Sequence, residues 1–305
     1  MTGKVIETRG YHSLIRTYEY GDINCILQGK LRQENITSTN PVAVGDNVEI
    51  VYDEKTKTGS VINVMERKNY VVRRSAKLSK SIHIIAANVD SSYLIVNVSK
   101  PVTLLSFIDR FLVSNEAYRV PTTIIINKTD ILNKKEKEDA LILENIYQKA
   151  GYEVLFTSAK TNEGIDILRN RLKGQTSLFS GNSGVGKSAL LNALQPNFNL
   201  KEGNLSDFYQ MGKHTTTFSK MLFLDKDTAM IDTPGLKAFG LVAVEKDELA
   251  MYFPEFKSRL QDCKFYNCTH LHEPHCAVIA ALENGEISLE RYNNYVKIYE
   301  SYDEY

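Results

Sequence analysis

The sequence lacks three features that would each indicate a particular class of protein: an excess of one charge, a long apolar run and a high cysteine content. Its 37 lysines and arginines balance its 37 aspartates and glutamates, so the 305 residues carry no net charge at pH 7. This balance excludes a uniformly basic protein that holds nucleic acid by bulk charge. A hydrophobic content of 43% with 24% charged residues excludes a largely disordered chain. Any polyanion must therefore be bound at a local site.

The chain also lacks a segment that could enter a membrane. No apolar run approaches the ~20 residues that a spanning helix needs, and residues 1–10 lack the apolar core of a signal peptide. We therefore expect a cytoplasmic protein without a membrane partner, and we expect a monomer. At roughly 150 residues per domain, the length suggests two domains with room for a third small one.

Residues 1–68 contain short segments with strand character, separated by turn residues. Without helical periodicity, such strands predict a small β-barrel such as an OB-fold. The following segment is basic and has no acidic residue; it contains Arg67, Lys68, Arg73, Arg74, Lys77 and Lys80. Two interpretations have equal weight: a solvated interdomain linker, or a surface that contacts a phosphate backbone beside the barrel.

From about residue 82 the pattern alternates between apolar strand runs and longer amphipathic helices. This alternation predicts an α/β fold with a mostly parallel sheet and helices on both faces. Ligands of such sheets bind beyond the carboxyl ends of the strands. The strand runs stop after about Phe253, and the last helical segment predicts packing along a face with Leu289 and Tyr295. We predict an OB-fold over 1–68, a central domain over 69–250 and a small helical domain over 251–305.

A phosphate-binding loop is indicated at residues 181–188, Gly-Asn-Ser-Gly-Val-Gly-Lys-Ser, between a strand run and a helical run. Its glycines let successive N–H groups point at phosphate oxygens, and the next helix adds its positive end. Lys187 would reach the β- and γ-phosphates as a catalytic residue, and the Ser188 hydroxyl would bind Mg²⁺. The nucleotide-binding residues expected here are Gly181, Asn182, Ser183, Gly184, Val185, Gly186, Lys187, Ser188 and Ala189.

Two further segments are expected at the phosphate end of the nucleotide. Asp232 follows an apolar strand run and would serve the outer shell of Mg²⁺, and the N–H of Gly235 would meet the γ-phosphate. Between the loop and Asp232 lies a run of three threonines. One hydroxyl there could complete the Mg²⁺ shell; we favour Thr216, with Thr215 as the alternative. A plain threonine-rich strand entry is the competing interpretation.

Guanine recognition is indicated by Asn-Lys-Thr-Asp at 127–130 and Ser-Ala-Lys at 158–160, each after a strand run. The Asp130 carboxylate can accept hydrogen bonds from N1–H and the N2 amine of guanine, whereas adenine offers an acceptor and no amine there. Sites built on such pairing discriminate by about 10⁴ or more. A simple helix cap is the competing interpretation of Thr129 and Asp130. The base-binding residues expected are Asn127, Lys128, Asp130, Ser158, Ala159 and Lys160.

The order of these segments is permuted relative to Ras-type GTPases, because here the base segments precede the phosphate loop. This order, with the β-rich start and a Cys/His cluster near the end, resembles the RsgA (YjeQ/YloQ) family of small ribosomal subunit biogenesis GTPases. The resemblance covers nearly the whole chain. It implies a circularly permuted P-loop GTPase domain between an OB-fold and a zinc domain. It also implies hydrolysis of GTP to GDP during late subunit maturation, stimulated by the small subunit and its rRNA.

Three cysteines and a histidine near the end offer a full tetrahedral set for one structural Zn²⁺. The expected ligands are Cys263, Cys268, His270 and Cys276, whose spacing matches the zinc segment of the resembled family. His272 and His275 are nearby alternatives to His270. Because the chain runs from Gly235 into this domain, we hypothesise that loss of the γ-phosphate changes the domain's orientation. Cys25, alone in a strand run, is expected to be a buried apolar residue.

The chain lacks the glutamine that orients the attacking water in Ras-type enzymes, because Leu236 follows Gly235. We therefore expect slow intrinsic turnover, with a partner or another side chain completing the site. His214 is the candidate, since the resembled family carries a histidine there; an exposed loop histidine is the equal alternative. Two other functions stay open: an RNA-binding module that holds GTP only as a structural ligand, and an ATP-dependent enzyme, which Asp130 disfavours.

Overall fold

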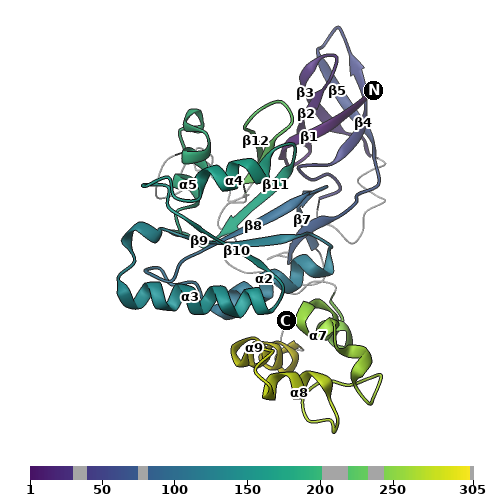
Figure 1. Ribbon diagram of the computed structural model, residues 1–305. Helices are drawn as coiled ribbons and strands as arrows, with labels where there is room; N and C mark the ends of the chain where they lie inside the picture. The colour runs from purple at the N-terminus through teal and green to yellow at the C-terminus, as the bar shows by residue number, and fades with distance from the viewer. Residues whose placement is uncertain (30–39, 75–81, 201–218, 233–243, 303–305) are drawn as a thin grey trace.

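The computed structural model describes residues 1–29, 40–74, 82–200, 219–232 and 244–302 (Figure 1). A barrel, a sheet covered by helices and a helical unit follow one another along the chain. The predicted α/β class and the OB-like barrel are both confirmed. Among the described residues, no helix combines the length and the apolar character that crossing a bilayer requires.

Five strands close the N-terminal barrel. They are β1 (Thr2–Arg9), β2 (His12–Thr17), β3 (Gly21–Leu27), β4 (Asn47–Asp53) and β5 (Thr58–Val64). Their order is β1-β2-β3-β5-β4, and β4 pairs back onto β1. Alternate side chains point inward, so residues such as Val5, Ile15 and Val61 are fully buried. Cys25 lies in this core as expected, and burial raises its pKa to about 11, which keeps the thiol protonated.

The central sheet contains five parallel strands in the order β10-β9-β8-β11-β13, with β12 antiparallel at the edge. The strands are β8 (Ser91–Val96), β9 (Thr122–Asn127), β10 (Glu153–Thr157), β11 (Thr176–Gly181), β12 (Lys220–Phe223) and β13 (Ala229–Asp232). Lys220 of β12 also pairs with Glu7 of β1, and this register joins the sheet to the barrel. The mostly parallel sheet is therefore as predicted.

Helices cover both faces of this sheet, as Figure 1 shows. The core on one face includes residues of α2 (Leu105–Ala117) and α3 (Lys134–Lys149), and the other core includes α4 (Ile165–Leu172) and α5 (Lys187–Leu194). Alternation along β8 explains the division, since Leu94 and Val96 face the first core while Tyr93 and Ile95 face the second. Short 3₁₀ turns complete the unit: η1 (Thr129–Ile131) and η2 (Pro196–Phe198).

The basic segment after the barrel is partly structured. Strand β6 (Tyr70–Arg74) pairs antiparallel with β7 (Ile82–Ala87), so this part is not an irregular linker. The Arg67 Nε atom donates to Asp46 at 2.6 Å, and Lys68 pairs with Asp90. Both cations therefore have a carboxylate partner within the protein, which weakens the prediction that they contact phosphate. Lys77 and Lys80 lie outside the described residues.

The C-terminal unit is made of short helices. They are η3 (Lys246–Tyr252), α7 (Pro254–Lys257), η4 (Leu260–Asp262), α8 (Ala277–Glu283) and α9 (Leu289–Glu300). The packing face predicted for the last helix is partly wrong. Tyr295 is buried, but Leu289 is 58% exposed, and the buried face includes Arg291 and Asn294.

A buried polar network joins this unit to α2 and explains that difference. Arg291 donates from Nη1 to Asp109 of α2 at 2.6 Å and from Nε to Glu255 of α7 at 2.7 Å. Tyr147 of α3 donates to the same Asp109 at 2.8 Å. Burial acts to lower the pKa of Arg291, but the charges of Asp109 and Glu255 outweigh it and raise that pKa. The helical unit is therefore anchored on the central domain.

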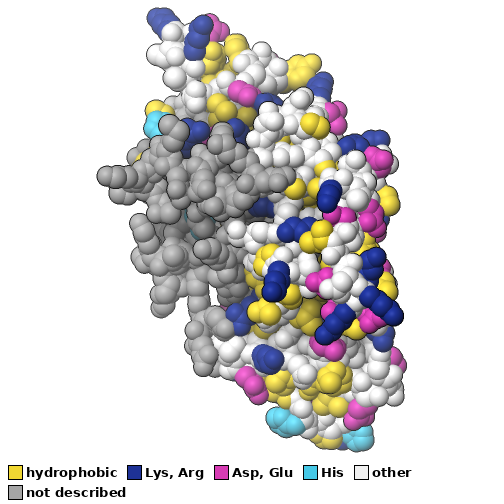
Figure 2. Space-filling model, turned by 90° about the vertical axis from the view of Figure 1, so that its left-hand side faces the viewer, with side chains coloured by type: hydrophobic (Ala, Val, Ile, Leu, Met, Phe, Trp, Pro, Cys, Tyr) yellow, Lys and Arg dark blue, Asp and Glu magenta, His cyan; other side chains and the backbone are white. Residues whose placement is uncertain are grey.

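The described residues on the face shown in Figure 2 form no extended field of one sign. Lysine and arginine side chains there are interspersed with acidic ones. This distribution agrees with the zero net charge of the sequence.

Candidate functional site

The phosphate-loop residues form a tight turn between β11 and α5, at the carboxyl edge of the sheet. Gly184 and Gly186 have φ values of 84° and 92°, which only glycine adopts without strain. A Cβ on Gly181 would lie 2.6 Å from the carbonyl oxygen of Ile95, and a Cβ on Gly186 would lie 2.5 Å from Asn127 Nδ2. The glycine spacing is thus required by the neighbouring strands as well as by the turn itself.

Lys187 and Asp232 meet at the first turn of α5. The Lys187 Nζ atom lies 2.7 Å from Asp232 Oδ1, and the two side chains are 8% and 3% exposed. Strands β11 and β13 are neighbours in the sheet, so the residues that follow their ends are neighbours too. A buried ammonium and carboxylate at the first turn of a helix that follows a glycine-rich turn suit phosphate and a divalent cation.

Asn127, at the end of β9, connects the two predicted halves of the nucleotide site. Its Nδ2 donates to the carbonyl oxygen of Val185 in the phosphate loop at 2.9 Å, and its Oδ1 accepts from Thr157 Oγ1 at 2.9 Å. Lys128, with a φ of 64°, donates from Nζ to the carbonyl oxygen of Gly184 at 2.6 Å. The base segment is therefore bonded directly to the phosphate loop, 56 to 58 positions further along the chain.

Asp130 lies on the outer side of this connection. Its Oδ1 accepts from Ser158 Oγ at 2.7 Å, and Ser158 also accepts from the backbone N–H of Thr161 at 3.1 Å. Asp130 is exposed, Ala159 is half-buried and Lys160 is exposed. A carboxylate held by a buried serine and open to solvent is suited to accept hydrogen bonds from a purine edge.

The structure brings together most of the residues predicted for the nucleotide. Asp130 and Lys187 lie on segments that the hydrogen bonds of Asn127 and Lys128 join at one rim of the sheet. Sequence reasoning missed two groups that hold this rim, Thr157 and Glu163; the latter accepts from Thr129 Oγ1 at 2.5 Å. The sequence gives no local signal for either contact. His214, Thr215, Thr216, Gly235 and Leu236 lie outside the described residues.

The four predicted zinc ligands converge in the C-terminal unit. Their ligand atoms all lie within 4.8 Å of one another, in a cluster of Cys263, Cys268, His270 and Cys276. His270 Nδ1 lies 3.7 Å from Cys263 Sγ and 3.3 Å from Cys276 Sγ. Tetrahedral zinc, with bonds of about 2.3 Å to sulfur and about 2.0 Å to nitrogen, needs such separations of about 3.5 Å. The donor set therefore fits a closed zinc site, and the exposed His272 and His275 are not in it.

The loop that carries His270 is fixed from two sides. Glu273 accepts from the backbone N–H of Thr269 at 2.8 Å and from Leu271 N–H at 3.1 Å. Burial acts to raise the pKa of Glu273, but hydrogen bonds from Thr269 outweigh it and hold that pKa at about 2. From α9, Tyr292 donates to the carbonyl oxygen of His270 at 2.8 Å. The ligand positions are thus set by partners outside the cluster.

Comparison with known proteins gives a consistent match. A family model described as RsgA GTPase matches residues 64–242. The Small ribosomal subunit biogenesis GTPase RsgA of Flavobacterium johnsoniae is 47% identical, with 100% of this chain and 94% of the relative covered. RsgA 2 of Bacteroides thetaiotaomicron, with the same description, is 46% identical over 100% of this chain and 98% of its own.

Solved structures agree with these relatives. The crystal structure of YjeQ from Thermotoga maritima superposes with a TM-score of 0.79 at 36% identity, covering 98% of this chain and 97% of that one. The crystal structure of YloQ, described as a circularly permuted GTPase, superposes with a TM-score of 0.74 at 28% identity, covering 99% and 95%. The permuted order of segments in this chain therefore has a structural counterpart.

Proposed function

Because the chain belongs to the RsgA GTPase family, we propose that it hydrolyses GTP during late maturation of the small ribosomal subunit and contacts the subunit's rRNA. The chain is a GTPase. Relatives named for this role match it along its whole length, which supports the assignment. The observation that carries the nucleotide assignment is the bonding of Asn127 and Lys128 to the phosphate loop. For this role we propose a cytoplasmic location, and we expect the protein to act as a monomer.

The residues at the rim would have separate roles in binding guanine, the phosphates and Mg²⁺. The Asp130 carboxylate would accept from N1–H and the N2 amine of guanine, while Lys128 lies along the base. Lys187 would turn from Asp232 to the β- and γ-phosphates and stabilise the charge that develops on the leaving oxygen. Hydroxyl and carboxylate oxygens are the ligands that Mg²⁺ prefers, so Ser188 and Asp232 fit a magnesium site. When bound, Mg²⁺ would neutralise phosphate charge.

None of the described residues is assigned to orient the water that attacks the γ-phosphate. We assign its orientation to His214 and the completion of the metal shell to Thr216, both outside the described residues. Since no glutamine follows Gly235, the isolated protein should be slow, and docking on the subunit should complete the site. The barrel of residues 1–68 is the proposed rRNA contact, because OB-folds offer a surface for single strands.

Phosphate release tests this function directly. We expect purified small subunits to raise the rate of GTP hydrolysis about tenfold or more, which corresponds to ~1.4 kcal/mol in the barrier. Large subunits should leave the rate near that of the protein alone. Equal rates in all three conditions, with tight GTP binding retained, would instead support a protein that uses GTP as a structural ligand.

Removal of zinc should affect the C-terminal unit and spare the nucleotide site. We expect Cys268→Ser to lose the single bound zinc and to increase amide hydrogen exchange in α8 and α9, because zinc binding supplies much of the folding free energy of small metal domains. GDP affinity should change by less than about threefold, since the rim lies on another unit. Cys25→Ala is the matched control and should retain one zinc per chain. Zinc content that is unchanged in Cys268→Ser would remove this residue from the ligand set.

A further inference from the structure

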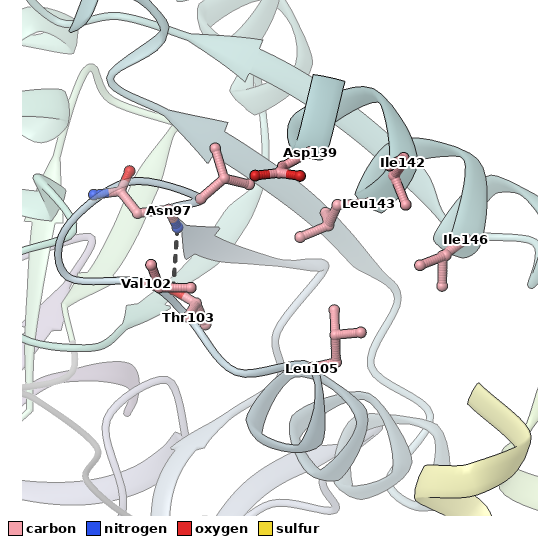
Figure 3. Close-up of a pocket in the computed structure, with 9 residues that line it drawn as sticks. Asn97, Val102, Thr103, Leu105, Asp139, Ile142, Leu143 and Ile146 are labelled. Carbon is pink, nitrogen blue, oxygen red and sulfur yellow. Dashed lines mark hydrogen bonds between the residues drawn. The ribbon is translucent and has the colours of Figure 1, made fainter. Parts of the chain in front are cut away.

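A cavity of about 220 Å³ lies beside the nucleotide rim, and the proposed reaction does not use it. It opens between the segment that follows β8, residues 97–104, and helix α3 (Figure 3). Its walls are mainly apolar and include Val98, Val102, Leu105, Ile142, Leu143 and Ile146. Asp139 is the one charged residue in the lining, and Figure 3 shows its carboxylate on the side of α3 that faces the 97–104 segment.

The wall formed by residues 97–104 is held in place before any partner arrives. The Asn97 N–H donates to Thr103 Oγ1 at 3.0 Å, and the Thr103 N–H donates back to the Asn97 carbonyl oxygen at 2.8 Å. Asn97, Ser99 and Thr103 are all buried. A partner would therefore meet a formed cavity and lose little free energy to ordering the loop.

Large apolar side chains stand exposed around the mouth. Of the lining residues, Val102 is 58% exposed and Ile142 57%; Leu104, between the lining residues Thr103 and Leu105, is 67% exposed. Exposed apolar side chains grouped at a cavity are typical of a protein interaction site, whereas isolated ones need no explanation. The mouth therefore offers both a pocket for an anchor side chain and an apolar rim around it.

Size and charge together select the occupant. Sites for small molecules measure roughly 300–1,000 Å³, so this cavity suits a single large side chain better than a cofactor. Asp139 is exposed, and among the described residues its side chain has no ion pair or hydrogen bond, so its carboxylate is available to a cation of the partner. A phosphate backbone would meet this negative charge and find no cation in the lining.

We propose that this cavity docks a protein segment of the small ribosomal subunit that inserts an apolar side chain and sets a lysine or arginine against Asp139. The proposal rests on the proposed function for the identity of the partner. The site also adjoins the nucleotide. The Asn97 side-chain amide, oriented to satisfy its neighbours, donates to the carbonyl oxygen of Asn127 at 2.7 Å, and Pro101 lies beside Gly184. A docked segment would therefore contact the wall, residues 97–104, that touches both the base segment and the phosphate loop.

Two adjacent residues of α3 provide a matched test. Leu141 and Ile142 are 58% and 57% exposed, but only Ile142 lines the cavity. We expect Ile142→Arg to weaken cosedimentation with purified small subunits about tenfold in the presence of a non-hydrolysable GTP analogue. Leu141→Arg should stay within about twofold of the wild type. Asp139→Lys and Glu138→Lys form a second pair, and Asp139→Lys alone should weaken binding. GDP affinity without subunits should be unchanged in all four, which also checks their folding.

The outcomes separate this proposal from the function on which it rests. Wild-type protein that fails to bind small subunits contradicts the proposed function and, with it, this partner. If the wild type binds small subunits and Ile142→Arg and Asp139→Lys bind them with the same affinity, the docking site alone is contradicted. A photoreactive benzoylphenylalanine in place of Ile142 should crosslink to a ribosomal protein in the complex; an adduct with rRNA instead would overturn the choice of a protein segment.

Discussion

Replacing Arg291 by leucine is expected to lower the free energy of unfolding by about 3–5 kcal/mol, because the change leaves two buried carboxylates without their cation. Arg291 is 1% exposed, and its partners Asp109 and Glu255 are 0% and 3% exposed in their side chains. Asn294 also donates to Asp109, at 2.5 Å. Its amide cannot replace a positive charge in so dry a site.

The measurement is denaturant unfolding of the full chain, together with hydrogen exchange of α9. The matched control is Arg171→Leu, which removes an arginine from an ion pair with Glu153 in which the side chains are 36% and 45% exposed. That pair is screened by water, so we expect a loss of about 1 kcal/mol or less. Similar losses in the two variants would show that the Arg291 network contributes no more than a surface pair. Adding Asp109→Asn and Glu255→Gln to Arg291→Leu should recover part of the stability, because the unpaired charges are then gone.

This network also bears on how the nucleotide could affect the C-terminal unit. The hypothesis drawn from the sequence links the γ-phosphate to that unit through the chain beyond Gly235. Asp109 lies on α2, which follows the 97–104 segment beside the phosphate loop. Through Arg291, the C-terminal unit is therefore tied to α2, and reorientation would have to move the two together or break buried ion pairs. Arg291→Leu should thus loosen the unit in both the GDP and the GTP-analogue states.

The nucleotide rim was predictable from the sequence because its parts obey a rule of topology. Each predicted segment that the structure describes follows a strand or ends one, and parallel strands bring their carboxyl ends to one edge. The cluster of three cysteines and one histidine was predictable because its four members lie within one short stretch of chain. The Arg291 network was not predictable, since Asp109 is 182 positions away and no local pattern connects them. Periodicity of apolar residues likewise assigned Leu289 to the packed face of α9, but Leu289 is exposed. The pattern cannot identify a buried arginine such as Arg291, whose partners lie far away in the sequence.

The second large effect is expected at the base. Asp130→Asn should lower the affinity for GDP about 10³-fold, because two hydrogen bonds to a carboxylate contribute roughly 1.5–3 kcal/mol each. An asparagine cannot accept from both N1–H and the N2 amine of guanine, since one end of its amide is a donor. Ser158 Oγ would remain 2.7 Å from the side chain at position 130, so the loop should keep its shape.

The same substitution should change which purine the protein prefers. Xanthine carries a carbonyl oxygen at C2 where guanine carries the amine, and the new amide N–H₂ can donate to it. We therefore expect Asp130→Asn to bind XDP more tightly than GDP, measured by competition against a fluorescent nucleotide. Asp139→Asn, an equivalent change in the next helix, should leave the preference for GDP intact. If Asp130→Asn still bound GDP much more tightly than XDP, the carboxylate would not be the group that recognises the base. Recognition would then have to rest on the backbone of residues 158–160.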